Sequence, residues 1–148
     1  MVRNRVNGHA WSKQIEIMQS VQDNERTAVP SCHGSGKSQV AAWAIARFID
    51  IHEPGTAFVV TTAPRAHQVR AILWRYLRRV HKKAGLPGTI TESMVPPEWK
   101  IDGEMVGFGR KPADLDGDSF QGLHEYRLLI VFDEPAASRN ASTSLQNR

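Results

Sequence analysis

The sequence is poor in cysteine and has no long apolar run. Cys32 is the single cysteine among 148 residues, which excludes a disulfide within the chain. No N-terminal segment resembles a signal peptide, and no stretch approaches the run of about 20 apolar residues that a membrane-spanning helix needs. We therefore expect a cytoplasmic protein without a membrane partner.

The sequence also lacks internal repeats, low-complexity linkers and the close ligand spacing of a zinc site. Its six histidines are scattered, so we predict no bound zinc. With 41% hydrophobic residues, the chain is long enough for one globular domain with its own core. The net charge of +4 favours a polyanionic partner, although an excess of this size also occurs on proteins that bind no nucleic acid.

The hydrophobic pattern of the first third predicts two helices separated by a short strand. The first is a short amphipathic helix with Ser12 as a candidate N-cap. A strand at 27–30 follows, and then a helix from Lys37 to Ile51 that is apolar on nearly every side and should be buried. The predicted apolar face of the first helix consists of Trp11, Ile15, Met18 and Gln22.

The rest of the chain continues this alternation. The β-branched run T-A-F-V-V-T-T at 56–62 predicts a central strand, and a helix is expected from about 65 to 84. This βαβα order favours an α/β fold with a mainly parallel sheet flanked by helices. A turn-rich segment leads to a hairpin around Asp102-Gly103, and R-L-L-I-V-F at 127–132 predicts a buried strand.

Between the strand at 27–30 and the buried helix lies S-C-H-G-S-G-K-S, residues 31–38. It departs from the phosphate-binding pattern G-x-x-x-x-G-K-[ST] at its first position, which is serine. Gly34 and Gly36 permit the φ angles and the close approach by which backbone N–H groups surround a phosphate. Lys37 would reach the β- and γ-phosphates, and the Ser38 hydroxyl would bind Mg²⁺. The alternative is a flexible glycine–serine turn with a solvated lysine.

Two adjacent carboxylates end the last predicted strand. Asp133 and Glu134 would lie at the C-terminal edge of the sheet, where open α/β sheets bind their ligands. Asp133 would belong to the Mg²⁺ shell, and Glu134 would polarise the attacking water. The alternative is that D-E-P only begins a loop.

Three segments in the same order resemble one family. S-C-H-G-S-G-K-S at 31–38, V-V-T-T-A-P-R-A-H-Q-V at 59–69 and F-Q-G-L-H-E-Y-R-L-L-I-V-F-D-E-P-A-A at 120–137 are similar to the ATPase domain of the large terminase subunit of tailed bacteriophages. The resemblance covers about residues 10–137. It implies an ASCE-type P-loop NTPase that uses ATP and Mg²⁺ to drive DNA into a procapsid.

The resemblance also implies roles and partners. Gln14 takes the place of a glutamine that recognises the adenine edge, since an amide both donates and accepts; without the resemblance, a surface glutamine is the simpler interpretation. Trp11 is expected to anchor the core rather than stack on a base.

The implied partners are double-stranded DNA, the portal or procapsid, the small terminase subunit and further copies of the chain in a ring, in a bacterial cell. The implied nucleotide-binding residues are Gln14, His33, Gly34, Ser35, Gly36, Lys37 and Ser38, with Lys37 and Glu134 catalytic and Ser38 and Asp133 on Mg²⁺.

A basic stripe marks the helix expected at 65–84, and no carboxylate occurs between Glu53 and Glu92. The stripe is either a solvated helix face or a contact for DNA, to which a motor must bind without sequence preference. Its members are Arg75, Arg78, Arg79 and Lys82.

The chain departs from the family in two ways. No arginine occurs inside the phosphate loop, so we expect an arginine from a neighbouring subunit, with Arg110 and Arg127 as candidates. Residues 138–148 are a polar tail unlike the family, and we expect a truncated ATPase domain (1–137) without the nuclease domain, with impaired hydrolysis and no DNA cleavage. The alternatives are a non-catalytic nucleic-acid-binding P-loop module and a small P-loop kinase, which would need an arginine-bearing lid.

Overall fold

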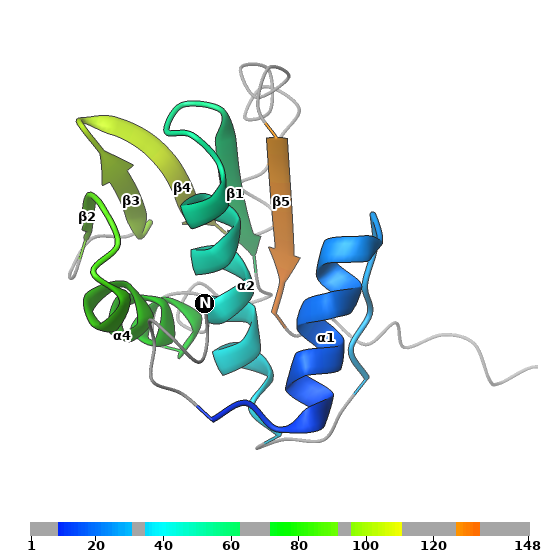
Figure 1. Cartoon of the computed structure of the whole chain (residues 1–148). Coiled ribbons are helices and arrows are strands. Elements are labelled where there is room, and N and C mark those ends of the chain that lie inside the picture. Colours follow the sequence, from blue (N-terminus) through cyan, green and yellow to red (C-terminus); the bar gives the residue numbers. More distant parts are fainter. Residues whose placement is uncertain (1–8, 31–34, 63–71, 92–95, 111–126, 134–148) are drawn as a thin grey trace, which may run out of the picture.

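The computed structural model describes residues 9–30, 35–62, 72–91, 96–110 and 127–133. These residues form an α/β fold in which helices flank a single sheet (Figure 1). No helix within these ranges is long and apolar enough to cross a membrane. The helices are α1 (Ser12–Asp23), α2 (Lys37–Ile51) and α4 (Trp74–Ala84). The strands are β1 (Ala57–Thr62), β2 (Thr89–Ile90), β3 (Glu98–Ile101), β4 (Glu104–Arg110) and β5 (Arg127–Phe132).

The five strands form one mixed sheet in the order β2-β3-β4-β1-β5. Strand β1 runs parallel to β4 and to β5, whereas β3 is antiparallel to β4 and to β2. The β3–β4 turn places Asp102 and Gly103 at φ 52° and 85°, as a tight hairpin turn requires. The predicted hairpin is confirmed. The expected α/β sheet flanked by helices is confirmed, but the sheet is mixed: β4, β1 and β5 are parallel, whereas the short connection between β3 and β4 permits only antiparallel pairing.

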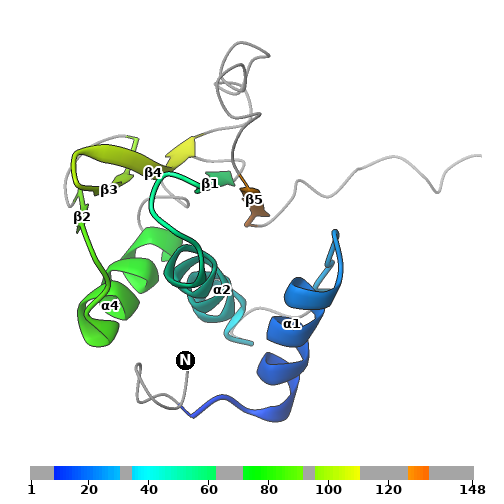
Figure 2. The same ribbon diagram turned by 45° about the horizontal axis from the view of Figure 1, so that its top comes forward.

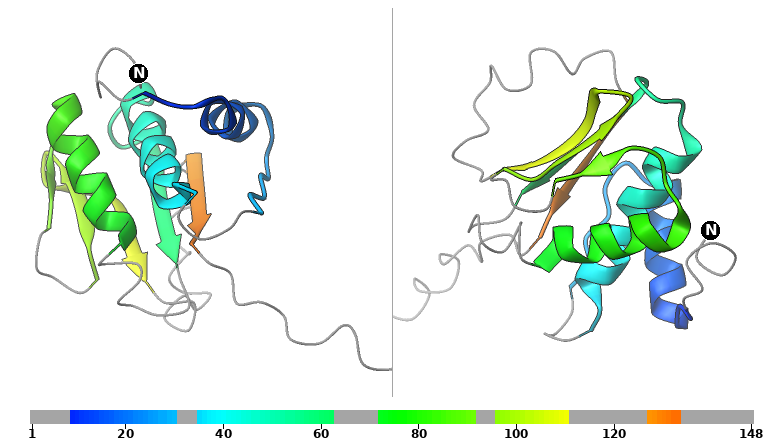
Figure 3. Two further views of the ribbon diagram at one scale, coloured as in Figure 1. Left: turned by 90° about the horizontal axis from the view of Figure 1, so that it is seen from below. Right: turned by 90° about the vertical axis from the view of Figure 1, so that its left-hand side faces the viewer.

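The described helices all lie against the same face of the sheet (Figure 2). Helix α2 lies between α1 and α4, and its buried residues form the main core with β1, α4 and β4 (Figure 3). The prediction of a buried helix at Lys37–Ile51 is therefore confirmed. The Trp74 indole N–H donates to Thr61 Oγ1 over 2.8 Å, so that two buried polar groups between α4 and β1 satisfy each other.

A smaller apolar cluster lies on the other face of the sheet. Phe58, Val60 and Phe108 are buried there, and the rings of Phe58 and Phe108 meet edge to face at 5.5 Å. No helix of the described residues covers this face. Strand β1 is buried at all six positions because it has a strand on each side, which confirms that 56–62 contains a central strand.

Strand β5 has the predicted bounds but a different environment. It is the outermost strand of the described sheet, beside β1. Its side chains alternate, so that Leu129 and Val131 pack against the main core. The prediction that β5 is buried is wrong, because its other side chains point to the face of the described sheet that no described helix covers. Those exposed side chains are Leu128, Ile130 and Phe132.

Helix α1 packs with a different face from the one that its hydropathy predicts. Trp11 and Ile15 are 54% and 47% exposed, whereas Gln14 is only 8% exposed. Ile17 and Met18, three and four residues after Gln14, pack against the main core. Only Met18 of the predicted face is part of this packing, and Gln22 is exposed. Because Gln14 is polar, hydropathy did not predict that it lies on the face of α1 that packs against the core.

Two further local predictions at the start of the chain are wrong. The N-cap of α1 is Trp11, and Ser12 is already helical. Residues 25–30 have no regular secondary structure, so the predicted strand at 27–30 does not form. A strand requires backbone pairing with a neighbour, and Pro30 has no N–H to contribute. The Thr27 side chain instead hydrogen-bonds through Oγ1 to Ser20 Oγ at 3.0 Å.

The helix predicted at 65–84 is confirmed in its C-terminal part. Helix α4 ends at Ala84, and Gly85 follows in the left-handed conformation with φ 60°. A π-helical turn at 72–73 precedes it, and 63–71 lies outside the described residues. The tail at 138–148 also lies outside them.

Candidate phosphate-binding site

The first turn of α2 lies at the same end of the molecule as the C-terminal ends of β1 and β5 (Figure 1). Asp133 directly follows β5, and its backbone N–H donates to the Thr62 carbonyl oxygen over 2.9 Å. The parallel pairing of β1 and β5 thus extends to the residue at which the predicted carboxylate pair begins. Open α/β sheets bind ligands at this edge.

Gly36 is the N-cap of α2 and adopts φ 80° and ψ 19°. This is the left-handed conformation, in which a side chain is strained and glycine is not. The Gly36 carbonyl oxygen accepts the first helical hydrogen bond, from the Val40 N–H at 3.1 Å. The N–H groups of a first helical turn have no acceptor within the helix, and the helix dipole adds partial positive charge, so the start of α2 suits an anion.

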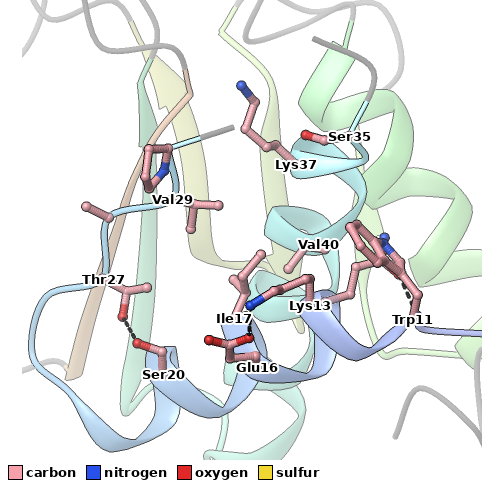
Figure 4. A pocket seen from close by; sticks show the side chains of 13 residues that line it. Trp11, Lys13, Glu16, Ile17, Ser20, Thr27, Val29, Ser35, Lys37 and Val40 are labelled. Atoms are coloured by element: carbon pink, nitrogen blue, oxygen red, sulfur yellow. Dashed lines mark hydrogen bonds and ion pairs between the residues drawn. The ribbon is translucent and has the colours of Figure 1, made fainter. Parts of the chain in front are cut away.

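Lys37 and Ser38 occupy the first turn of α2. Both are half-buried, as are Ser35 and Gly36. The Lys37 side chain extends so that its ammonium group points away from α1 (Figure 4). The start of α2 therefore combines a glycine cap, a cation and a hydroxyl on consecutive residues, as a bound phosphate and its metal ion require.

A cavity of about 420 Å³ lies between α1, the segment 27–30 and the start of α2 (Figure 4). This volume falls within the range of small-molecule sites. Trp11 stands at its wall and is 54% exposed, so the expectation that Trp11 anchors the core is wrong. The remaining lining residues are Lys13, Gln14, Glu16, Ile17, Ser20, Thr27, Ala28, Val29, Pro30, Ser35, Lys37 and Val40.

An ion pair lies along the α1 wall of this cavity. Lys13 Nζ is 2.8 Å from Glu16 Oε2, and the hydrogen bond to Glu16 raises the pKa of Lys13. Both side chains are largely exposed, so this pair contributes little to stability. Lys13, Glu16 and residues 27–30 were not predicted as site residues from the sequence. The helical period would have placed Lys13 on the face of α1 next to that of Gln14.

Gln14 joins the start of α1 to the start of α2. Its side-chain Oε1 accepts a hydrogen bond from the Trp11 backbone N–H at 3.2 Å. Its Nε2 lies so close to Gly36 that a Cβ added to Gly36 would be 3.0 Å away. Gln14 of α1 thus reaches the N-terminal end of α2.

The structure brings most of the described candidate residues to one end of the sheet. Gln14, Ser35 and Lys37 line the cavity, with Gly36 between the last two. Ser38 shares the first turn of α2, and Asp133 follows β5. A hydroxyl and a carboxylate are oxygen ligands of the kind that Mg²⁺ takes. His33, Gly34 and Glu134 lie outside the described residues.

The two arginines considered as fingers lie at opposite ends of the sheet. Arg110 is the last residue of β4 and pairs in register with Thr62, at the C-terminal edge of β1. Its guanidinium carbon lies 4.7 Å from the centre of the Phe108 ring. Arg127 begins β5 and pairs with Ala57, at the far end from Asp133.

Helix α4 has a basic outer face that is narrower than predicted. Arg75, Arg79 and Lys82 are exposed, and Leu77 and Val80 are buried on the opposite side. Arg78 lies half-buried at the border of this face, where its Nη1 donates to the Thr91 carbonyl oxygen over 3.2 Å. The DNA contact predicted for these residues stays a prediction.

Comparison of the chain with protein families, with curated proteins and with solved structures finds no match. The functional interpretation therefore depends on the residues of the sequence and on their arrangement in the structure.

Proposed function

We propose that this chain is an ATP-binding domain of the kind found in the large terminase subunit, and that it couples ATP hydrolysis to the movement of double-stranded DNA. The observation that supports the proposal is the start of α2. Gly36 caps the helix in the left-handed conformation, and Lys37 follows it beside a cavity between α1, the segment 27–30 and the start of α2. The terminase assignment itself depends on the three sequence segments described above.

In the proposed complex, the phosphates lie at the first turn of α2. Lys37 neutralises their charge, and Ser35 and Gly36 present backbone N–H groups. The base and sugar occupy the cavity, where the exposed Trp11 ring and the apolar atoms of Ile17 and Val29 offer a surface for a purine. The cavity volume of about 420 Å³ is compatible with a nucleoside.

Ser38 and Asp133 are the proposed ligands of Mg²⁺, which would neutralise charge on the phosphate oxygens. Glu134 is the proposed general base that orients the attacking water. Of the two finger candidates, Arg110 lies at the same edge of the sheet as Asp133, but its guanidinium packs on Phe108 on the face away from α2, so the proposed finger comes from a neighbouring subunit. Arg127 lies at the other end and would act only on a neighbouring subunit.

The proposed contact for DNA is the outer face of α4. Arg75, Arg79 and Lys82 offer exposed positive charge without a carboxylate on the same helix. Such a surface binds phosphates without reading bases, which suits a motor that must move along any sequence. The portal, the small subunit and a ring of copies follow from the family proposal alone.

The proposal is tested by calorimetry of ATP–Mg²⁺ binding to the unmodified protein and to Lys37→Ala. A hydrogen bond to a charged group contributes about 1.5–3 kcal/mol, so the variant should bind ATP at least about tenfold more weakly. Lys100→Ala is the matched control, because Lys100 is an exposed lysine of β3 outside the cavity. Equal ATP affinity of all three proteins would refute the proposed phosphate site.

The basic face of α4 favours a second candidate, a nucleic-acid-binding module without catalysis. This module would bind DNA with a strong salt dependence and with the same affinity in the presence and absence of ATP. The motor domain should instead bind ATP, and its DNA affinity should change with the bound nucleotide. Measuring DNA affinity with and without ATP–Mg²⁺ distinguishes the two.

A further inference from the structure

We propose that Gln14 is a positioning residue that holds the phosphate loop at Gly36, rather than a residue that recognises the base. The nucleotide-binding consequences rest on the proposed function. The structural role does not, because it concerns contacts between α1 and α2 in the protein without a ligand.

Gln14 already makes a hydrogen bond within its own helix. Its Oε1 accepts the Trp11 backbone N–H at 3.2 Å, which satisfies one of the N–H groups at the start of α1. A residue that recognises adenine through its amide must turn both the oxygen and the nitrogen toward the base edge. Here the oxygen faces the backbone of its own helix, and the side chain is 8% exposed.

The nitrogen of the same amide lies at the start of α2. Nε2 lies against Gly36, at a place where an added Cβ would be 3.0 Å away. A Cβ added there would come closer to the amide than ordinary van der Waals contact allows, and Gly36 is the residue whose φ of 80° begins α2. The amide therefore occupies the space that a side chain at position 36 would need, beside the left-handed cap.

These two contacts connect the first turns of α1 and α2 through one side chain. Ile17 and Met18 fix α1 against the core on the same face as Gln14, so the amide is attached to a packed helix rather than to a loop. A group held by a rigid element and by its own hydrogen bond can position a binding loop. Gln14 thus determines where the Gly36 carbonyl and the following N–H groups lie before any phosphate arrives.

The structural role is tested by hydrogen exchange of the protein without nucleotide. The Val40 N–H donates to the Gly36 carbonyl oxygen, so its exchange rate reports on the cap. In Gln14→Ala, this amide should exchange about two- to tenfold faster, which corresponds to the loss of one ordinary hydrogen bond. Amides near Ile49, at the other end of α2, should be unchanged and report on whether the variant is folded.

Gln19→Ala is the matched control, since Gln19 is an exposed glutamine of the same helix that bonds to Asp23. It should leave the Val40 amide unchanged. Gln14→Glu keeps the acceptor for Trp11 but replaces Nε2 with oxygen, so it should also accelerate exchange at Val40. Unchanged exchange at Val40 in both Gln14 variants would overturn the positioning role.

A second experiment measures the affinities of the unmodified protein and of Gln14→Ala for ATP and for tripolyphosphate, which has no base. If Gln14 positions the loop, Gln14→Ala should lose affinity for both ligands by the same factor. If Gln14 recognises the base, the variant should lose affinity for ATP and bind tripolyphosphate as the unmodified protein does, and the positioning role would be overturned. Failure of the unmodified protein to bind either ligand would refute the proposed function, while the exchange measurement still decides the role of Gln14.

Discussion

Replacing Gly36 with alanine should lower the free energy of unfolding by more than the strain of its left-handed backbone conformation. A non-glycine residue in the left-handed conformation costs roughly 1–2 kcal/mol. At Gly36 the new Cβ also meets Gln14 Nε2 at 3.0 Å, so the amide must shift by a few tenths of an ångström, which weakens the Gln14–Trp11 hydrogen bond. A net hydrogen bond contributes about 0.5–1.5 kcal/mol. The free energy of unfolding should therefore fall by about 1.5–3.5 kcal/mol.

Gly85→Ala provides the matched control. Gly85 has φ 60°, and a Cβ added there meets nothing within 4 Å, so this variant should lose only the roughly 1–2 kcal/mol of backbone strain. Thermal unfolding measures the difference. For a chain of this size each kcal/mol lowers Tm by about 2–4 °C, so Gly36→Ala should melt about 1–6 °C below Gly85→Ala.

Combining each glycine substitution with Gln14→Ala isolates the contact. Without the amide, alanine at position 36 has space, so the additional loss at Gly36 should disappear while the loss at Gly85 stays the same. Equal destabilisation by the two single variants, or an additional loss at Gly36 that persists without Gln14, would refute the inferred contact. This cycle requires no ligand.

Two further predictions concern chemistry and DNA. Asp133→Asn should weaken the Mg²⁺ dependence of ATP binding, measured by calorimetry at several Mg²⁺ concentrations, because the metal loses a charged ligand. Glu134→Gln should keep the affinity for ATP–Mg²⁺ and lose turnover in a steady-state ATPase assay. Unchanged turnover in Glu134→Gln would remove Glu134 from the catalytic role. Alanine at Arg75, Arg79 and Lys82 together should weaken DNA binding and reduce the slope of log K against log salt by about 0.9 for each DNA phosphate that these side chains neutralise. Arg26→Ala, at an exposed arginine before the site, should leave the slope unchanged, and an equal effect of both would contradict a specific role for α4.

The elements that sequence predicted well are those whose pattern matches their burial. Helix α2 is apolar on most sides and is buried by neighbours on both sides. Strand β1 is a compact β-branched run and lies at the centre of the described sheet. The β3–β4 hairpin is determined by Asp102-Gly103, whose conformation is local. Periodicity and turn chemistry are sufficient where tertiary packing agrees with them.

The predictions that failed depended on neighbours that the sequence does not reveal. Hydropathy placed Trp11 in the core, but the packing of Ile17 and Met18 turns Gln14 inward. The segment 27–30 has strand-forming residues and no strand beside it in the described sheet. A pattern indicates which residues can pair or be buried, and the arrangement of the other elements determines which do.

One part of the candidate site follows from a local sequence pattern, and another part depends on how the helices pack. The position of Gly36 and Lys37 at the start of α2 follows from a local sequence pattern, and the structure has the predicted helix start. The contact between Gln14 and Gly36 joins residues more than twenty positions apart in the sequence, and it exists only because α1 packs beside α2. No local pattern could have predicted that contact.

The most direct test of the central claim is a nuclear magnetic resonance titration of the labelled protein with ATP–Mg²⁺. The largest shifts should occur at the backbone amides of Gly36 and Lys37 and at the Trp11 indole N–H, whereas the amide of Gly85 should stay unchanged. The same titration with tripolyphosphate should move Gly36 and Lys37 but leave the Trp11 indole in place. Shifts confined to the basic face of α4, or no shifts at the start of α2, would contradict the proposal that this protein binds ATP between α1 and α2.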